Sequence, residues 1–371
     1  MTKNLAKAPW SRKGSAVRRT AAVVLSLGTL IGTGTANAAI AATGTTASPQ
    51  ALPSGCSGTS TITCHYAVAP GNYDVTVSIG SSSSAGQTAM WVEARRLMLP
   101  TTTTAAGTVT QYSFTVNVRQ PEGQPTGQGG TGTPGLDIRF TGSAPRVSAV
   151  SVKPASQPLV AYIAGDSTVC DQPTAPYTGW GQMITTSVGP GAVIANYADS
   201  GESSGSFLSN SALFPAIVSR VKAGDLVFIQ FGHNDKTTTA SAYRSHLTTM
   251  VDEVRAKGGV PVLVTPMVRH LFNGTQLTPT ALHVNSLGVD LPAQMRSVAS
   301  TLHVPLIDLT AKSAALVTSL GPTASAALYL RASVDGVTDN THFSQYGATK
   351  MAGLVLQGIR EQHLSLVSYL R

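Results

Sequence analysis

The sequence predicts two folded parts in series, an antiparallel β-sandwich followed by an α/β domain whose parallel sheet carries helices on both faces. Residues 54–155 alternate apolar and polar side chains with a period of two, which is typical of strands with one buried face. From residue 156 to 371, short apolar runs alternate with longer helix-compatible segments, a pattern that indicates a parallel sheet. The change of pattern near residue 155 places the domain boundary there.

The N-terminus has the composition of an export signal. An apolar run, Ala21–Leu27, follows six basic residues and no acidic one, and small residues lead to Ala36-Asn37-Ala38. This order predicts a cleaved signal peptide over residues 1–38 and therefore a secreted, extracellular protein. The pair Arg18-Arg19 leaves the twin-arginine route open beside the ordinary one. No later segment has the length of a membrane-spanning helix, so we expect no stable membrane anchor.

Charge argues against nucleic acid as a partner. The whole chain has a net charge of +8, from 25 basic and 17 acidic residues. Six of the basic residues belong to the expected signal peptide, so the mature chain is close to neutral. A basic surface for phosphate backbones is therefore not expected. Residues 39–53 are small and polar and are predicted to form a flexible leader.

Cysteines are few. Cys56 and Cys64 lie close together in a chain expected to be exported, which predicts a disulfide between them. Cys170 is expected to be a buried, small apolar residue. No C-x-x-C pair or other metal-ligand spacing is present in the sequence, so neither a metal nor a cofactor is predicted.

Three alternating segments carry the sandwich prediction: Tyr73–Ile79, Tyr112–Val118 and Leu136–Phe140. The stretch Gly123–Gly135 between the last two is rich in glycine and predicts a long loop. The sandwich resembles carbohydrate-binding modules only in outline.

Two features of the sandwich each fit two interpretations. Trp91 and Tyr112 suit either stacking on sugar rings or packing in the core, and packing is favoured. The pair Arg95-Arg96 suits either contact with uronic acids or a solvated surface, and the solvated surface is favoured.

Five apolar runs predict the strands of the α/β domain, and functional side chains follow several of them. Catalytic groups in such folds lie just beyond the carboxyl ends of parallel strands. The runs are Leu159–Ala164, Val193–Asn196, Leu226–Phe231, Val260–Thr265 and Val304–Leu309.

Four short motifs follow these runs or precede the last helix. Ser167, in Gly165-Asp166-Ser167-Thr168, is expected on a tight turn before a helix, although for this tetrapeptide alone an N-cap or turn serine is the favoured interpretation. Gly201 is placed to present its backbone amide to a developing negative charge, and Asn234 is placed to present its side-chain amide to the same charge. Asp339 precedes His342 by three residues, so its carboxylate can orient the imidazole.

These motifs resemble those of the SGNH (GDSL-type) hydrolase superfamily, and the similarity extends through most of residues 159–362. Its four blocks match Gly165-Asp166-Ser167, Gly201, Gly232-x-Asn234 and Asp339-x-x-His342. Further segments resemble the rhamnogalacturonan acetylesterase group within it: Gly179-Trp180-Gly181-Gln182, Phe231-Gly232-His233-Asn234-Asp235 and Thr341-His342-Phe343-Ser344.

The resemblance implies a flavodoxin-like sheet and a serine esterase. Ser167 would be the nucleophile, His342 the base and Asp339 the group that holds the imidazole. The backbone amides of Ser167 and Gly201 and the side-chain amide of Asn234 would form the oxyanion hole. His233 and Asp235 would position the loop and take no part in the reaction.

The implied function is the removal of acetyl groups from plant cell-wall polysaccharide, with acetylated rhamnogalacturonan or pectin as the substrate partner. Two departures weaken the substrate inference: Glu202 stands where group members often have a basic residue, and Arg269-His270 replaces an arginine-rich stretch. The alternatives are an esterase of broader specificity, acting on acetylxylan or aryl acetates, and a non-catalytic polysaccharide-binding protein. The sequence carries no signal for an oligomeric state.

Overall fold

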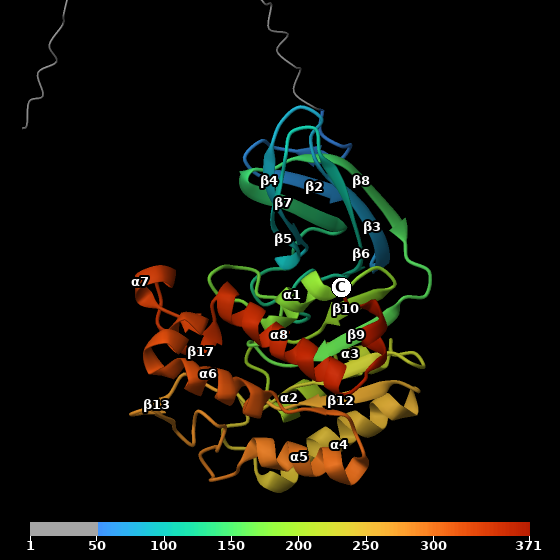
Figure 1. Cartoon of the computed structure of the whole chain (residues 1–371). Coiled ribbons are helices and arrows are strands. Elements are labelled where there is room, and N and C mark those ends of the chain that lie inside the picture. The colour runs from blue at the N-terminus through green and yellow to red at the C-terminus, as the bar shows by residue number, and fades with distance from the viewer. Residues whose placement is uncertain (1–50) are drawn as a thin grey trace, which may run out of the picture. The chain divides into compact units, whose positions relative to one another are not determined.

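The computed structural model describes residues 51–371, which all belong to one compact unit (Figure 1). The expected signal peptide, residues 1–38, and residues 39–50 of the expected leader lie outside the described residues. The boundaries 39–53, 54–155 and 156–371 stay predictions.

The first part of the described chain consists of two antiparallel sheets, whose strand orders are β1-β2-β7-β4-β5 and β6-β3-β8 (Figure 1). Alternate apolar side chains of the two sheets, among them Val75, Phe114 and Ile138, form one buried core. The strands are β1 (Cys56–Ser57), β2 (Ile62–Tyr66), β3 (Gly71–Gly80), β4 (Gly86–Val92), β5 (Arg96–Thr104), β6 (Val109–Val118), β7 (Leu136–Ala144) and β8 (Val147–Pro154).

Cys56 and Cys64 face each other across the β1–β2 ladder, and a disulfide joins them. Because β1 has only two residues, this covalent link holds a segment that few backbone hydrogen bonds could hold. Cys170 is a free, fully buried thiol, as the sequence indicated.

The second part contains a five-stranded parallel sheet of order β10-β9-β11-β12-β15. This confirms the predicted parallel sheet. Every residue of β10 and β11 is buried, as expected where both faces are covered. The strands are β9 (Leu159–Ala164), β10 (Ala192–Asn196), β11 (Leu226–Ile229), β12 (Val260–Val264) and β15 (Leu306–Ile307).

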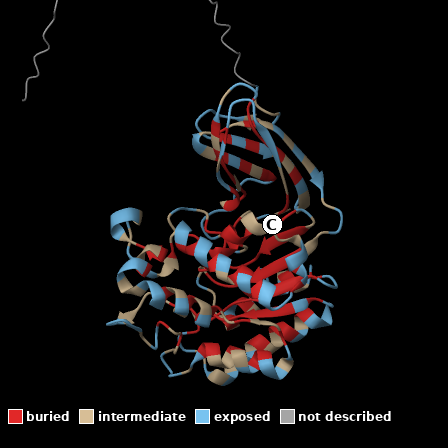
Figure 2. Ribbon diagram, in the orientation of Figure 1, coloured by how far each residue is buried: buried red, intermediate tan, exposed pale blue. Residues whose placement is uncertain are grey.

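Helices cover both faces of this sheet (Figures 1 and 2). One face packs against α1 (Trp180–Met183), α6 (Leu309–Ser325) and α8 (Gln345–Glu361). The other packs against α2 (Ser204–Ser209), α3 (Phe214–Val218), α4 (Ala240–Ala256) and α5 (Leu291–Leu302). The remaining elements are η1 (Ile184–Ser187), β13 (Phe272–Asn273), β14 (Gln276–Leu277), η2 (Ala326–Leu328), β16 (Tyr329–Leu330), α7 (Ala332–Asp335), β17 (Asp339–Phe343) and η3 (Ser365–Tyr369).

Two local expectations need correction. Ser167 does not precede a helix directly: residues 167–169 form a turn, and α1 begins only at Trp180. The run Val304–Leu309 gives a strand of only two residues, because the Asp308 side chain accepts a hydrogen bond from the Ala311 amide and caps α6.

The prediction for Arg95-Arg96 was wrong. Arg96 is only 1% exposed, and its Nε lies 2.7 Å from Oδ2 of Asp171, which also lies 3.1 Å from Nη2 of Arg119. Arg95 donates to the carbonyl oxygens of Gln172 and Tyr177. Both arginines thus join the sandwich to the segment that follows Ser167. Nothing in alternating strand patterns signals such an ion pair, because its partner lies 75 residues away.

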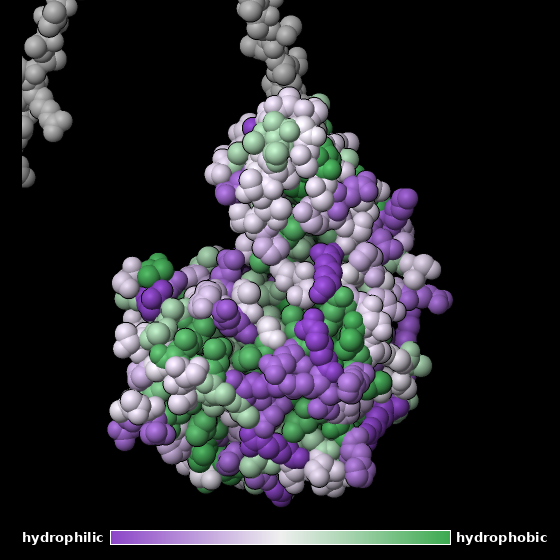
Figure 3. Space-filling view, viewed as in Figure 1, coloured by the Kyte–Doolittle hydropathy of each residue, from purple (hydrophilic) through white to green (hydrophobic). Residues whose placement is uncertain are grey.

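No helix among residues 51–371 combines the length and the apolar character needed to cross a bilayer. On the face shown in Figure 3, hydrophilic side chains form a band across the second part, and apolar residues occur in separate patches between them.

Glu93, between β4 and β5, is a buried acid whose charge is poorly compensated. It is 4% exposed, and Oε1 accepts a hydrogen bond from the Asp137 amide. Burial raises the pKa of Glu93 to about 8, although the nearby Arg96 acts to lower it. The folded chain therefore keeps the proton of this carboxyl up to about pH 8.

We predict that Glu93→Gln removes a loss of folding stability that grows as pH rises. An unfolded glutamate loses its proton near pH 4.5 and the folded one near 8, so the Glu93 contribution to the free energy of unfolding falls between these values as pH rises. The fall is at most about 1.4 kcal/mol per pH unit. Denaturant titrations of both proteins from pH 5 to 9 should show the variant gaining stability relative to wild type. A difference that stays constant with pH would contradict the buried, protonated state.

Candidate active site

The structure brings Ser167, His342 and Asp339 together. Nε2 of His342 lies 2.8 Å from Oγ of Ser167, and Nδ1 lies 2.7 Å from Oδ2 of Asp339. Each distance is that of a hydrogen bond. The carboxylate accepts from Nδ1, so the imidazole presents the lone pair of Nε2 to the serine hydroxyl. The arrangement can therefore take a proton from Ser167.

Ser167 is positioned by the turn that follows β9. The Asp166 carbonyl accepts the amides of Val169 and Cys170 at 3.0 Å, which closes the turn. The Asp166 side chain accepts the Thr168 amide at 2.9 Å and its hydroxyl at 2.7 Å. A Cβ at Gly165 would lie 2.9 Å from the Val169 side chain, so only glycine fits there.

Asp339 and His342 lie on β17, a short strand paired with β16. Oδ1 of Asp339 accepts the amides of Thr341 at 2.7 Å and His342 at 3.0 Å, which leaves Oδ2 for the imidazole. Partial burial acts to raise the pKa of Asp339, but these hydrogen bonds and the imidazole together lower it to about 2. The carboxylate is thus ionised at any pH above that value.

The three expected oxyanion donors lie on loops that follow β9, β10 and β11, which are neighbours in the sheet. Within residues 51–371, neither the Ser167 amide nor the Gly201 amide has a hydrogen-bond acceptor. The Asn234 side chain donates one hydrogen bond, to the Glu202 carbonyl at 3.0 Å, and its amide has a second N–H. Gly201 has a φ of 84°, a conformation that favours glycine.

Two polar residues of the Gly232–Asp235 motif are buried and hold the loops. Nδ1 of His233 lies 3.3 Å from Oδ2 of Asp166, and burial lowers the pKa of His233, so the ring is neutral at pH 7. Asp235 accepts the Ser204 hydroxyl at 2.6 Å and the Thr238 hydroxyl at 3.0 Å. Neither side chain has a hydrogen bond to a triad residue in the part of the chain that the structure describes.

The sequence analysis assigned no role in the site to two further residues, and it noted Arg269 only as a departure from the family pattern. Arg269 donates to the His233 carbonyl at 2.8 Å and to the Thr341 hydroxyl, so it connects the Asn234 loop to the triad loop. The ring of Tyr177 packs edge-on against His342, with 5.3 Å between ring centroids. Both contacts depend on tertiary packing, and neither residue lies in a recognisable motif.

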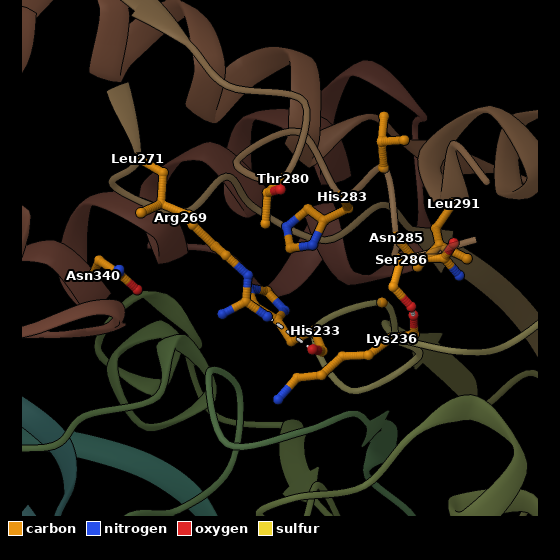
Figure 4. A pocket seen from close by; sticks show the side chains of 12 residues that line it. His233, Lys236, Arg269, Leu271, Thr280, His283, Asn285, Ser286, Leu291 and Asn340 are labelled. Carbon is orange, nitrogen blue, oxygen red and sulfur yellow. Dashed lines mark hydrogen bonds between the residues drawn. The ribbon is translucent and has the colours of Figure 1, made fainter. Parts of the chain in front are cut away.

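A cavity of about 390 Å³ lies beside the triad loop and the Asn234 loop (Figure 4). Figure 4 shows the Arg269 side chain beside His233 and the Lys236 side chain below them, and Leu271 and Leu291 contribute apolar wall. No aspartate or glutamate of residues 51–371 lines this cavity. Burial lowers the pKa of His233 and that of His283, so the positive charge comes from Lys236 and Arg269. The cavity therefore favours an anionic ligand.

Among residues 51–371, no three His, Cys, Asp or Glu side chains cluster in a way that could hold a metal ion.

A parallel α/β fold in which a serine, an imidazole and a carboxylate form a hydrogen-bonded series is typical of serine-type hydrolases. Residues 163–350 match the model of the GDSL-like Lipase/Acylhydrolase family, and the chain belongs to that family. The resemblance inferred from the four motifs is thus confirmed, and the protein is a carboxylic ester hydrolase.

Several Bacillus subtilis (strain 168) proteins are similar to the chain. The rhamnogalacturonan acetylesterase RhgT is 37% identical over 227 residues, which cover 58% of this chain and 95% of RhgT. The probable rhamnogalacturonan acetylesterase YesY is 33% identical over 215 residues, which cover 55% of this chain and 94% of YesY. The crystal structure of YxiM is 25% identical, with a TM-score of 0.49, and covers 82% of this chain and 81% of YxiM.

We predict that Asn234→Ala lowers kcat by roughly 10²–10³ and changes KM little, because the amide binds the oxyanion more tightly than the substrate carbonyl. Steady-state hydrolysis of an aryl acetate measures both constants. Asn210→Ala, the same change at the end of α2, serves as the control. Equal kcat values for Asn234→Ala and wild type would remove Asn234 from the oxyanion hole.

Proposed function

We propose that this ester hydrolase is an exported carbohydrate esterase that removes acetyl groups from pectic polysaccharide, most specifically rhamnogalacturonan. The observation that carries the proposal is the continuous hydrogen-bonded chain from Ser167 Oγ through His342 to Asp339. It supports a Ser-His-Asp triad working through an acyl-enzyme.

In the first half of the reaction, Ser167 Oγ attacks the acetyl carbonyl carbon while its proton passes to Nε2 of His342. The carbonyl π electrons move to oxygen, where the amides of Ser167 and Gly201 and the Asn234 side chain stabilise the negative charge. When the intermediate collapses, the bond to the sugar oxygen breaks and that oxygen takes the proton from His342. Water then attacks the acetyl-serine by the same steps and releases acetate.

Two observations support a pectic substrate. The similar Bacillus proteins RhgT and YesY are named as a rhamnogalacturonan acetylesterase and a probable one. The cavity beside the triad loop offers Lys236 and Arg269 and no carboxylate. Rhamnogalacturonan contains uronic acids, whose carboxylates suit these cations.

Export is proposed from the sequence of residues 1–38, with its basic start, apolar run and small residues before position 38. The disulfide between Cys56 and Cys64 is consistent with an oxidising destination.

Ser167→Ala tests the triad. We expect turnover of an aryl acetate to fall to a residual background, because no other nucleophile replaces the hydroxyl. The fold should persist, since Ser167 is only partly buried and its side chain packs little. Circular dichroism controls for folding. If the folded variant kept wild-type turnover, the triad and the acyl-enzyme would both be wrong.

The substrate class is tested by acetate release from acetylated rhamnogalacturonan, homogalacturonan and xylan. We expect kcat/KM to be highest on rhamnogalacturonan. Similar values on all three would favour the esterase of broader specificity, and no release from any substrate would favour a binding protein.

Lys236→Gln tests the charge of the cavity. We expect KM for acetylated pectic oligosaccharides to rise about three- to tenfold, because a charge-assisted contact with a carboxylate is lost. KM for acetylated xylo-oligosaccharides and kcat for an aryl acetate should stay unchanged. Lys257→Gln, at the end of α4, is the matched control. An equal change of KM on the neutral substrate would contradict an anion-binding role.

A further inference from the structure

The loop between β6 and β7 of the sandwich reaches into the catalytic part of the chain. Gln124, Thr126 and Gln128 of this loop contact Asp199 and Ser200, the two residues before Gly201. We propose that this loop positions the Gly201 amide for oxyanion binding, so that the sandwich is a working part of the esterase. The inference rests on the oxyanion hole of the proposed function.

Asp199 is fully buried and is held by the sandwich loop. Its Oδ2 accepts the Thr126 amide at 2.9 Å and the Thr126 hydroxyl at 2.8 Å, and its Oδ1 accepts Nε2 of Gln128 at 2.6 Å. No Lys, Arg or His within residues 51–371 forms an ion pair with it. The loop therefore supplies the donors that make burial of this carboxylate tolerable.

Both backbone groups of Ser200 are bound by the same loop. The Ser200 amide donates to Oε1 of Gln124 at 2.7 Å, and the Ser200 carbonyl accepts from Nε2 of Gln128 at 2.8 Å. Gln124 is itself only 3% exposed, so this contact is shielded from water. The peptide before Gly201 thus has its orientation set from the sandwich.

Peptide planarity carries this orientation to Gly201. The Ser200 carbonyl and the Gly201 N–H belong to one rigid planar group and point in opposite directions. Fixing the carbonyl through Gln128 therefore fixes the direction of the N–H.

Gly201 has little support of its own. It is exposed, and a Cβ built on it would meet nothing within 4 Å. On its other side, Asp235 holds the Ser204 amide and hydroxyl. The position of the Gly201 amide is thus set by the sandwich loop on one side and by the Asp235 loop on the other.

The test uses full-length Gln128→Ala and Thr126→Val/Gln128→Ala, assayed with an aryl acetate that is too small to need the sandwich for binding. We expect kcat and the pre-steady-state acylation rate to fall about tenfold in the double variant and less in the single one, with KM within about twofold. Thermal unfolding of both variants should shift to lower temperature, because they lose donors to the buried Asp199 carboxylate. Circular dichroism checks that both remain folded at the assay temperature.

Two variants serve as controls. Gln120→Ala makes the same change in the same connection, but within residues 51–371 the Gln120 side chain donates its one hydrogen bond to the Thr131 carbonyl, so its kinetics should equal those of wild type. Thr126→Ser keeps the hydroxyl that Asp199 accepts and should preserve kcat.

Two outcomes overturn the inference alone: kcat within twofold of wild type in the double variant, or a kcat loss accompanied by a change of KM well beyond twofold, which would mark a general distortion of the site. Ser167→Ala separates these from failure of the proposed function. If Ser167→Ala stays active, both the proposed function and this inference are wrong. If Ser167→Ala is inactive while the loop variants behave as wild type, only the inference falls.

Discussion

The proposed reaction depends on one contact between distant parts of the chain, the hydrogen bond between His342 and Ser167. These residues are 175 positions apart, and 2.8 Å separates Nε2 from Oγ. A misplacement of about 1 Å in such a group can cost roughly a hundredfold in rate. The parallel sheet meets this demand because β9, which presents Ser167, is flanked by the strands that lead to Gly201 and Asn234.

Buried carboxylates fix the loops that the sheet brings together. Asp166 shapes the Ser167 turn, Asp199 ties the Gly201 loop to the sandwich, and Asp235 ties α2 to the Asn234 loop. Asp171 joins the same region to Arg96 and Arg119 of the sandwich. Each carboxylate accepts several hydrogen bonds, which compensates for its lost hydration. The loops of the site are thus held in place by hydrogen bonds to buried carboxylates.

Sequence reasoning worked best where local pattern decides structure. The bounds of β9 agree with the expected run Leu159–Ala164, because an apolar run bounded by turn residues acts locally.

Sequence reasoning failed where the structure depends on residues that are distant in the sequence. The burial of Arg96 requires Asp171, and the role of Gln128 requires Asp199, 71 positions away. A glycine-rich loop gives no local sign that it will contact a catalytic loop.

The central claim, that Ser167 carries the acetyl group during turnover, is tested most directly by rapid acid quenching of the enzyme with excess aryl acetate, followed by mass spectrometry of its peptides. The account predicts one added acetyl group, located on Ser167 and absent from folded Ser167→Ala. Turnover without any acetylated Ser167 peptide, or with the acetyl group on another residue, would contradict it.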